Sequence, residues 1–205
     1  MSGVPRRRMV QAAATRSEIV TAAGRLMLER GYIGTSITAV AGEAGVVVQT
    51  VYNSVGSKAE LLAAVLDRVA EQPDAPAFLS AATRGSLAEA GTATEIIRIV
   101  AVSSALVNER TSNILRIVSE AAVVDSDVAE FEHKRDAARL HGFVEIAALL
   151  RLKRGLRGGT SDHEAAATMW ALAQAHTYRT LVVSLGWSTD AYRTWLEKSL
   201  LAALL

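Results

Sequence analysis

The chain contains no cysteine, only three prolines and few aromatic side chains among its 205 residues. Without cysteine it can form no disulfide and has neither a thiolate metal site nor a thiol nucleophile. Proline breaks helices, whereas the abundant alanine and leucine stabilise them. Half of the residues are hydrophobic and about a fifth are charged, which is typical of a globular protein. The composition therefore predicts an all-α protein.

Long uncharged runs are also missing. The longest, such as residues 165–178, have 14 residues, fewer than the roughly 18 needed to span a bilayer. Arg6, Arg7 and Arg8 are not followed by an apolar segment, so we do not expect a signal peptide. A cytoplasmic protein is the expectation.

The formal net charge of +1 is unevenly distributed along the chain. Residues 1–70 carry eight Lys and Arg against five Asp and Glu, while the remainder carries 14 against 16. This basic excess is compatible with a nucleic-acid-binding N-terminal part but does not establish one.

Three regions are expected along the chain. Residues 1–12 are predicted to be a disordered basic arm, in which Arg6, Arg7 and Arg8 either contact DNA or are simply solvated. Residues 13–72 form a small helical domain that ends before Pro73 and Pro76, and residues 73–205 form a larger helical domain. The expected helices are 13–30, 36–44, a short third helix ending near 54, 58–70, 76–84, 92–109, 111–124, 127–154, 161–185 and 189–204. Capping boxes, Ser57 with Glu60 and Ser161 with Glu164, begin two of them.

The segment after Gly45 can be interpreted in two ways. Val46, Val47 and Val48 have strand propensity, but a strand here would have no partner elsewhere in the sequence. Two short helices joined at Gly45 form instead a helix-turn-helix, in which small Ala41 lets the helices cross closely. The apolar positions have inward spacing: Ile37, Val40, Ala44, Val46 and Val51.

The outward face of the second short helix is suited to DNA. In a helix-turn-helix the start of the second helix faces the major groove, where Gln and Asn read base edges and valine packs on a thymine methyl. Hydroxyls and cations at helix starts suit phosphates. The predicted DNA-binding residues are Ser36, Thr38, Val47, Val48, Gln49, Thr50, Tyr52, Asn53 and Lys58.

Residues 13–62 resemble the DNA-binding domain of the TetR family of bacterial transcriptional regulators. The resemblance rests on Gly31-Tyr32, Thr35-Ser36-Ile37, Val40-Ala41, Ala44-Gly45-Val46, Thr50-Val51-Tyr52 and Ser57-Lys58-x-Glu60-Leu61-Leu62. Two positions depart from the family pattern, because Val47 replaces a small hydroxyl cap and Val55 replaces an aromatic residue. The ending Gly186-Trp187-Ser188, with Tyr192, Trp195 and Leu196, also resembles such regulators.

The resemblance implies an all-α homodimer that represses a palindromic operator and is released by a small molecule. Helix 58–70 is the expected lever, because it joins the two expected domains. The resemblance also implies that the last two helices pair with those of a second copy, through Met169, Trp170, Leu181, Tyr192, Trp195, Leu196 and Leu200. Aromatic and polar side chains in apolar stretches suit an effector pocket. The candidates for effector contact are His141, Phe143, Trp170, His176 and Tyr178.

Enzyme chemistry and metal binding find little support. The four histidines lack metal-ligand spacing, and Asp125-x-Asp127 is better explained as a turn between helices. There is no nucleophile elbow and no phosphate-binding glycine loop, so neither a catalytic residue, a metal nor a cofactor is expected. One alternative is a helical small-molecule-binding protein or enzyme whose DNA-binding bundle is non-functional. Another is an activator rather than a repressor.

Overall fold

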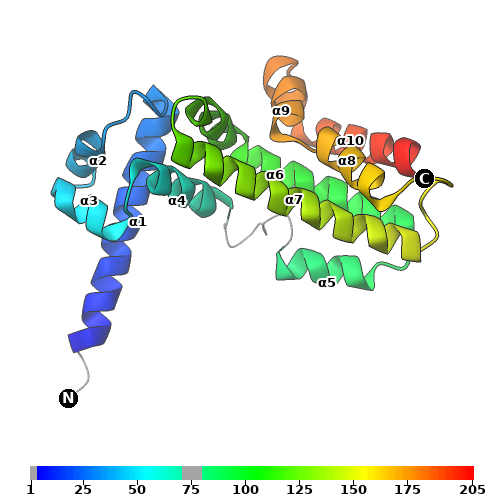
Figure 1. Ribbon diagram of the computed structural model, residues 1–205, viewed down its shortest axis with the longest axis horizontal. Coiled ribbons are helices and arrows are strands. Elements are labelled where there is room, and N and C mark those ends of the chain that lie inside the picture. The colour runs from blue at the N-terminus through cyan, green and yellow to red at the C-terminus, as the bar shows by residue number, and fades with distance from the viewer. Residues whose placement is uncertain (1–3, 71–79) are drawn as a thin grey trace. The chain divides into compact units, whose positions relative to one another are not determined.

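The computed structural model describes residues 4–70 and 80–205, and these ranges contain helices and no strand (Figure 1). The prediction of an all-α protein is confirmed. Among the described helices, none is both long and apolar enough to cross a membrane. The elements are α1 (Val4–Arg30), α2 (Ile37–Glu43), α3 (Val48–Ser54), α4 (Lys58–Ala70), α5 (Ala81–Glu89), α6 (Ala93–Ala122), α7 (Ser126–Leu152), α8 (Asp162–Leu172), α9 (Ala175–Tyr178), the π-helix η1 (Arg179–Ser184) and α10 (Thr189–Leu204).

The chain forms two compact units. The N-terminal unit comprises Met1–Val69 and Asn113–Glu132, and the C-terminal unit comprises Ala70–Ser112 and His133–Leu205. The chain first passes from the N-terminal to the C-terminal unit after Val69, close to the boundary expected near residue 72. The return of residues 113–132 to the N-terminal unit was not expected. It means that α6 and α7 each contribute to both units.

The N-terminal unit has its core between α1, α2, α3 and α4. Each helix presents one apolar face, and the short α2 and α3 depend on this packing because isolated seven-residue helices are unstable in water. The side chains that are at most 2 % exposed here include Ile19, Ala23, Leu26, Met27, Val40, Ala41, Val51, Leu61 and Leu62.

Helix starts were well predicted where a side chain caps the backbone. Ser36 caps α2 by accepting from the Ala39 N–H, at 3.1 Å. In the capping box at α4, the Glu60 N–H donates to Ser57 Oγ and the Ser57 N–H donates to Glu60 Oε2. The second capping box, at Ser161, is also present. The predicted bounds 58–70 and 189–204 are confirmed.

The expected arm at residues 1–12 is helical from Val4 onward. Proline is tolerated in the first turn of a helix, so Pro5 does not prevent this, and the alanines at 12–14 favour continuation. The prediction of a disordered arm was therefore wrong for this segment.

Other helix predictions also need correction. The expected helices 92–109 and 111–124 are one helix, α6, in which the Thr111 hydroxyl donates to the Val107 carbonyl, at 2.7 Å. The helix expected at 76–84 is α5, Ala81–Glu89, and residues 76–79 lie outside the described residues. The helix expected at 161–185 is instead divided into α8, α9 and η1.

The division after α8 has a physical cause in the C-terminal unit. The Ala173 carbonyl accepts hydrogen bonds from Asn108 Nδ2 of α6, at 3.0 Å, and from Arg139 Nη2 of α7, at 2.7 Å. A carbonyl held by two side chains is not available to a continuing helix. Around it lies an apolar core that includes Ile96, Ile97, Val100, Phe143, Ile146, Leu150, Met169, Tyr192, Leu196 and Leu200.

We predict opposite effects for alanine at two glycines of the helix-turn-helix. Gly45 has a φ of 66°, whereas Gly42 lies in α2, and an added Cβ would meet nothing within 4 Å at either position. Gly45→Ala should therefore lower the free energy of unfolding by about 1–2 kcal/mol through left-handed strain. Gly42→Ala should raise it by up to about 1 kcal/mol. Thermal unfolding followed by circular dichroism tests this, and a shift of the same sign in both variants would contradict it.

Candidate nucleic-acid interface

The candidate interface is built on the packing of α2 against α3. The turn between them is closed by the Val46 N–H, which donates to the Ala41 carbonyl at 2.9 Å, while Gly45 takes the left-handed conformation. Val40 and Val51 are fully buried and Ala41 is 2 % exposed. Ile37, Ala44 and Val46 are half-buried. The helical interpretation of the valine-rich segment is therefore confirmed.

This packing leaves the predicted DNA-binding side chains on the surface. Tyr52 is 49 % exposed, and Val47 is 69 % exposed. Gln49 donates through Nε2 to Asn53 Oδ1, at 2.9 Å, so these two amides already point the same way along α3. The exposed residues also include Ser36, Thr38, Val48, Gln49 and Asn53, and Thr50 is half-buried. Their contact with DNA stays a prediction.

Arg16 of α1 is a residue that the sequence did not reveal. Its guanidinium donates to the carbonyl of Ser54, the last residue of α3. A cation at the end of a helix satisfies free carbonyls and complements the helix dipole. Arg16 thus helps to hold α3 against α1. Only knowledge of the fold brings together two residues that are 38 positions apart.

The two departures from the family pattern have visible consequences at α3. Val47 occupies the N-cap position and makes no side-chain hydrogen bond to the helix. Val55 ends the helix with a backbone bond to the Val51 carbonyl. The first turn of α3 therefore lacks the support that Ser36 gives to α2.

Lys58, the first residue of α4, lies beside an aromatic ring. Its Nζ is 4.2 Å from the centroid of the Tyr32 ring, a cation–π distance. Burial lowers the pKa of Lys58, and the nearby Asp125 carboxylate acts in the opposite direction. The Lys58 side chain is half-buried, so its charge is shared between Tyr32, Asp125 and any phosphate that it contacts.

The basic side chains near the N-terminus lie on α1. Arg8 is exposed. The side chains of Arg6 and Arg7 lie outside the described residues, so their predicted contact with DNA stays a prediction. In the described part of the chain no group of three or more His, Asp or Glu is arranged to hold a metal ion.

The effector candidates divide into two groups. His141 and His176 are exposed, which is a correction, because apolar stretches on either side suggested that they face the interior. Phe143 and Tyr178 are buried and Trp170 is half-buried. The Arg139 guanidinium lies 5.6 Å from the Phe143 ring centroid.

A polar cluster in the C-terminal core was missed by sequence analysis. Ser104 and Asn108 are one turn apart on α6, are fully buried, and leave Ser104 Oγ and Asn108 Oδ1 without a hydrogen-bond partner. Asn108 Nδ2 also contacts the Tyr192 hydroxyl, at 3.2 Å. Burial raises the pKa of Tyr192 to about 12, and burial followed by Arg135 lowers the pKa of Arg139 to about 10.

Each unpaired buried acceptor lowers the free energy of unfolding by roughly 1–3 kcal/mol, so its presence in a core requires an explanation. The only signal in the sequence was polar residues on the buried face of a helix. The cluster contains Ser104, Asn108, Arg139, Tyr192 and the Ala173 carbonyl, and we call it the α6 polar cluster.

Four of the predicted dimer-interface residues are not at a surface. Met169, Tyr192, Leu196 and Leu200 are completely buried within a single chain, so their side chains cannot contact a second copy. The apolar stripe on the last helix is core because α8 and α10 pack together. Trp170, Leu181 and Trp195 are half-buried and keep some accessible surface.

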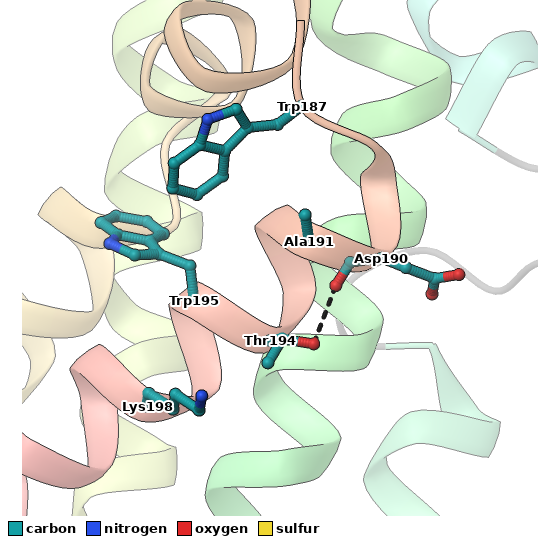
Figure 2. A pocket seen from close by; sticks show the side chains of 6 residues that line it. All are labelled: Trp187, Asp190, Ala191, Thr194, Trp195 and Lys198. Carbon is teal, nitrogen blue, oxygen red and sulfur yellow. Dashed lines mark hydrogen bonds between the residues drawn. The ribbon is translucent and has the colours of Figure 1, made fainter. Parts of the chain in front are cut away.

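A different apolar surface lies on the outer side of α10. Figure 2 shows the side chains that line a hollow: Trp187, Asp190, Ala191, Thr194, Trp195 and Lys198. The volume of this hollow is about 620 Å³. The indole rings meet edge to face, with centroids 6.5 Å apart. Val183, Leu185 and Trp187 are 57 %, 62 % and 36 % exposed. We call the residues that line the hollow, taken together with the exposed Val183 and Leu185 that precede Trp187 in the chain, the Trp187 face.

Comparison with known proteins agrees with this geometry. A family model described as "Bacterial regulatory proteins, tetR family" matches residues 19–65. The chain is 30 % identical over 164 residues to a Pseudomonas putida protein named "Probable HTH-type transcriptional regulator ArpR", covering 79 % of this chain and 77 % of that one. It is 29 % identical, with the same coverage, to the HTH-type transcriptional regulator TtgR, also of Pseudomonas putida.

Similar solved structures include NalD, the secondary repressor of the MexAB-OprM multidrug efflux pump in Pseudomonas aeruginosa. The TM-score is 0.72 at 21 % identity, over 95 % of this chain and 98 % of that chain. At this identity the likeness shows the fold.

We predict that Val47→Ser stabilises the uncapped helix α3. A serine hydroxyl at the N-cap can accept from a backbone N–H of the first turn, which is worth about 1 kcal/mol. The matched control is Val47→Ala, which shortens the same exposed side chain without adding an acceptor. Urea unfolding without DNA should show the serine variant to be the more stable. Equal midpoints for the two variants would contradict this prediction.

Proposed function

The chain belongs to the TetR family and is a DNA-binding transcriptional regulator, and from this premise we propose that it is a homodimeric repressor whose operator complex is released by a small-molecule effector. The observation that carries the proposal is the exposed row of groove-reading side chains on α3, held outward by buried Val51. Within the C-terminal unit, the α6 polar cluster and the Trp187 face supply candidates for the effector and for the second copy.

Operator recognition is assigned to α3 and its neighbours. Gln49 and Asn53 present amides that can bond adenine edges, and Val48 can pack on a thymine methyl. Their mutual hydrogen bond of 2.9 Å pre-orients both amide side chains. We assign to phosphate contacts on either side the residues Ser36, Thr38, Tyr52 and Lys58. A dimer would present two such helices to major grooves one turn, about 34 Å, apart.

Dimerisation is assigned to the Trp187 face. Large exposed apolar surfaces rimmed by polar residues are typical of protein interfaces, and aromatic residues dominate their energetics. Here Asp190 and Lys198 line the same hollow as the two indoles. This replaces the fully buried part of the predicted interface and retains Trp195.

Effector binding is assigned to the α6 polar cluster. Asn108 Oδ1 and Ser104 Oγ are buried polar atoms without a partner, so a ligand that donates to them would remove an existing penalty. The surroundings are apolar and aromatic. The rings of Tyr178 and Tyr192 meet edge to face, with their centroids 5.0 Å apart. The guanidinium of Arg139 disfavours a cationic ligand. We therefore infer a neutral or anionic, largely apolar effector with a hydrogen-bond donor.

The effector would act by favouring one arrangement of the two recognition helices over another. An effector that does not alter operator affinity would contradict this part of the proposal. The alternative, a small-molecule-binding protein with a non-functional DNA-binding bundle, is supported only by the uncapped start of α3. A steep fall of DNA affinity with rising salt concentration would exclude that alternative.

Selection of bound sequences from random duplex DNA tests operator recognition. Wild-type protein should enrich a palindrome, because two copies related by two-fold symmetry read two half-sites. Gln49→Ala should blur one base pair in each half-site, with a loss of about 1–3 kcal/mol of discrimination there. Gln174→Ala is the matched control, since its side chain makes no cap bond in the C-terminal unit. Without enrichment at low salt, recognition by α3 is refuted.

The assembly state tests the Trp187 face. Leu185→Glu places a charge on this face and should weaken dimerisation at least tenfold, or about 1.4 kcal/mol. Leu152→Glu is the matched control, because Leu152 is 77 % exposed in the same unit and lies outside the face. Sedimentation equilibrium should give a dimer for wild type and control and more monomer for Leu185→Glu. Unchanged association of Leu185→Glu would refute this assignment.

A further inference from the structure

We propose that the hydrogen bond between Tyr32 and Asp125 is the contact through which the α6–α7 hairpin positions the DNA-binding helices. The proposal rests on the operator binding argued above and adds a specific residue pair to it. Tyr32 follows α1, and Asp125 lies in the turn between α6 and α7. Both residues lie within the N-terminal unit.

The bond itself is short and sheltered. The Tyr32 hydroxyl donates to Asp125 Oδ2 at 2.6 Å, across 93 positions of sequence. Tyr32 is only 6 % exposed. Burial and the Asp125 carboxylate raise the pKa of Tyr32, while the bond to Tyr32 is the main influence lowering the pKa of Asp125. A neutral phenol therefore faces an ionised carboxylate at neutral pH, which is the stronger kind of hydrogen bond.

Asp125 connects Tyr32 directly to the start of α7. Its second oxygen, Oδ1, accepts from the Asp127 N–H at 3.0 Å and from the Val128 N–H at 3.3 Å. Its own N–H donates to the Ala121 carbonyl at the end of α6, at 2.9 Å. One residue thus binds the last turn of α6, the first turn of α7 and the segment after α1. A shift of the hairpin must move all three bonds or break one.

Tyr32 passes this restraint to the DNA-binding helices in two directions. Toward α2, the Thr35 N–H donates to the Tyr32 carbonyl at 3.2 Å, and Thr35 is 1 % exposed immediately before the Ser36 cap. Toward α4, the Tyr32 ring lies under Lys58 Nζ, at 4.2 Å. Tyr32 therefore contacts the segment before α2 through its carbonyl and the start of α4 through its ring.

The hairpin reaches from this contact into the C-terminal unit. Helix α6 carries Asn108 of the α6 polar cluster and continues to Ala122 without interruption. At 1.5 Å per residue these two positions are about 21 Å apart along one helix. Helix α7 carries Arg139 and begins at Ser126. A rearrangement around Asn108 is thus transmitted to Asp125 along continuous helices.

The expectation that α4 is the lever is thereby extended. Helix α4 is still the segment that leads toward the C-terminal unit, but its first residue, Lys58, is in contact with Tyr32. The hairpin and α4 meet at the same phenol. Because the hairpin and α4 both contact the Tyr32 side chain, Tyr32 is a positioning residue for operator binding and not a DNA contact.

Hydrogen exchange tests this with the full-length protein and the duplex enriched by wild type in the selection described above. In wild type, adding this duplex should slow exchange in α3 and also in residues 104–122 of α6, by at least about fivefold. In Tyr32→Phe, slowing in α3 should persist and slowing in 104–122 should fall below about twofold. Asp125→Asn, which keeps the size of the side chain, should behave in the same way.

The matched control is Thr83→Val, which removes another buried hydroxyl with a hydrogen bond, to Ser80 Oγ at 3.1 Å, in the other unit. It should keep the wild-type response in both segments. A wild-type response in 104–122 that survives both Tyr32→Phe and Asp125→Asn would overturn the coupling role. Binding of the duplex by wild type without any response in 104–122 would overturn it too. Failure of wild type to bind any duplex would instead overturn the proposed function on which this inference rests.

Discussion

The packing of two seven-residue helices against α1 is the constraint on which the DNA-binding part of the molecule depends. Neither α2 nor α3 is long enough to be stable alone, so their conformation comes from burying Val40, Ala41 and Val51. Once Val51 points inward, the geometry of a helix leaves Gln49 and Asn53 on the opposite side. The exposed recognition surface is thus a direct consequence of the core.

The C-terminal unit follows a different principle. Its core is large and apolar, yet it encloses Ser104 Oγ and Asn108 Oδ1 without partners and uses the Ala173 carbonyl twice. A core designed only for stability would replace these groups by apolar ones. The break between α8 and α9 lies at Ala173 of this cluster, and a π-helix follows α9. Such π-helical turns are often found at functional sites. The unpaired polar atoms thus lower the stability of the core at the place where we propose ligand recognition.

The two units share continuous helices. Because residues 113–132 belong to the N-terminal unit, α6 and α7 each contribute residues to both units. Each of the two helices is continuous along its length. The Tyr32 phenol lies where this hairpin, α4 and the segment before α2 come together. This arrangement explains why a motif residue that is not predicted to touch DNA is placed beside residues that are.

Local signals in the sequence were sufficient for part of this description. Capping boxes at Ser57 and Ser161, the glycine at the turn and the period of the apolar residues identified α2, α3, α4, α10 and the exposed face of α3, because each depends on neighbours within a few positions. Helix continuity was harder to predict. Nothing local shows that α6 runs through Thr111 or that α8 stops at Ala173, where side chains from two distant helices take the carbonyl.

What the sequence determined by itself is the helical class, the helix-turn-helix and the family, since these follow from short-range patterns and a contiguous motif. Tertiary structure alone decided which apolar faces are buried. It placed Tyr192, Leu196 and Leu200 in the core and left Trp187 at the surface, although both sets belong to apolar stretches. It also brought Tyr32 to Asp125 and Arg16 to Ser54. Contacts between distant residues depend on how helices pack in space, and one-dimensional periodicity carries no information about the partner of each face.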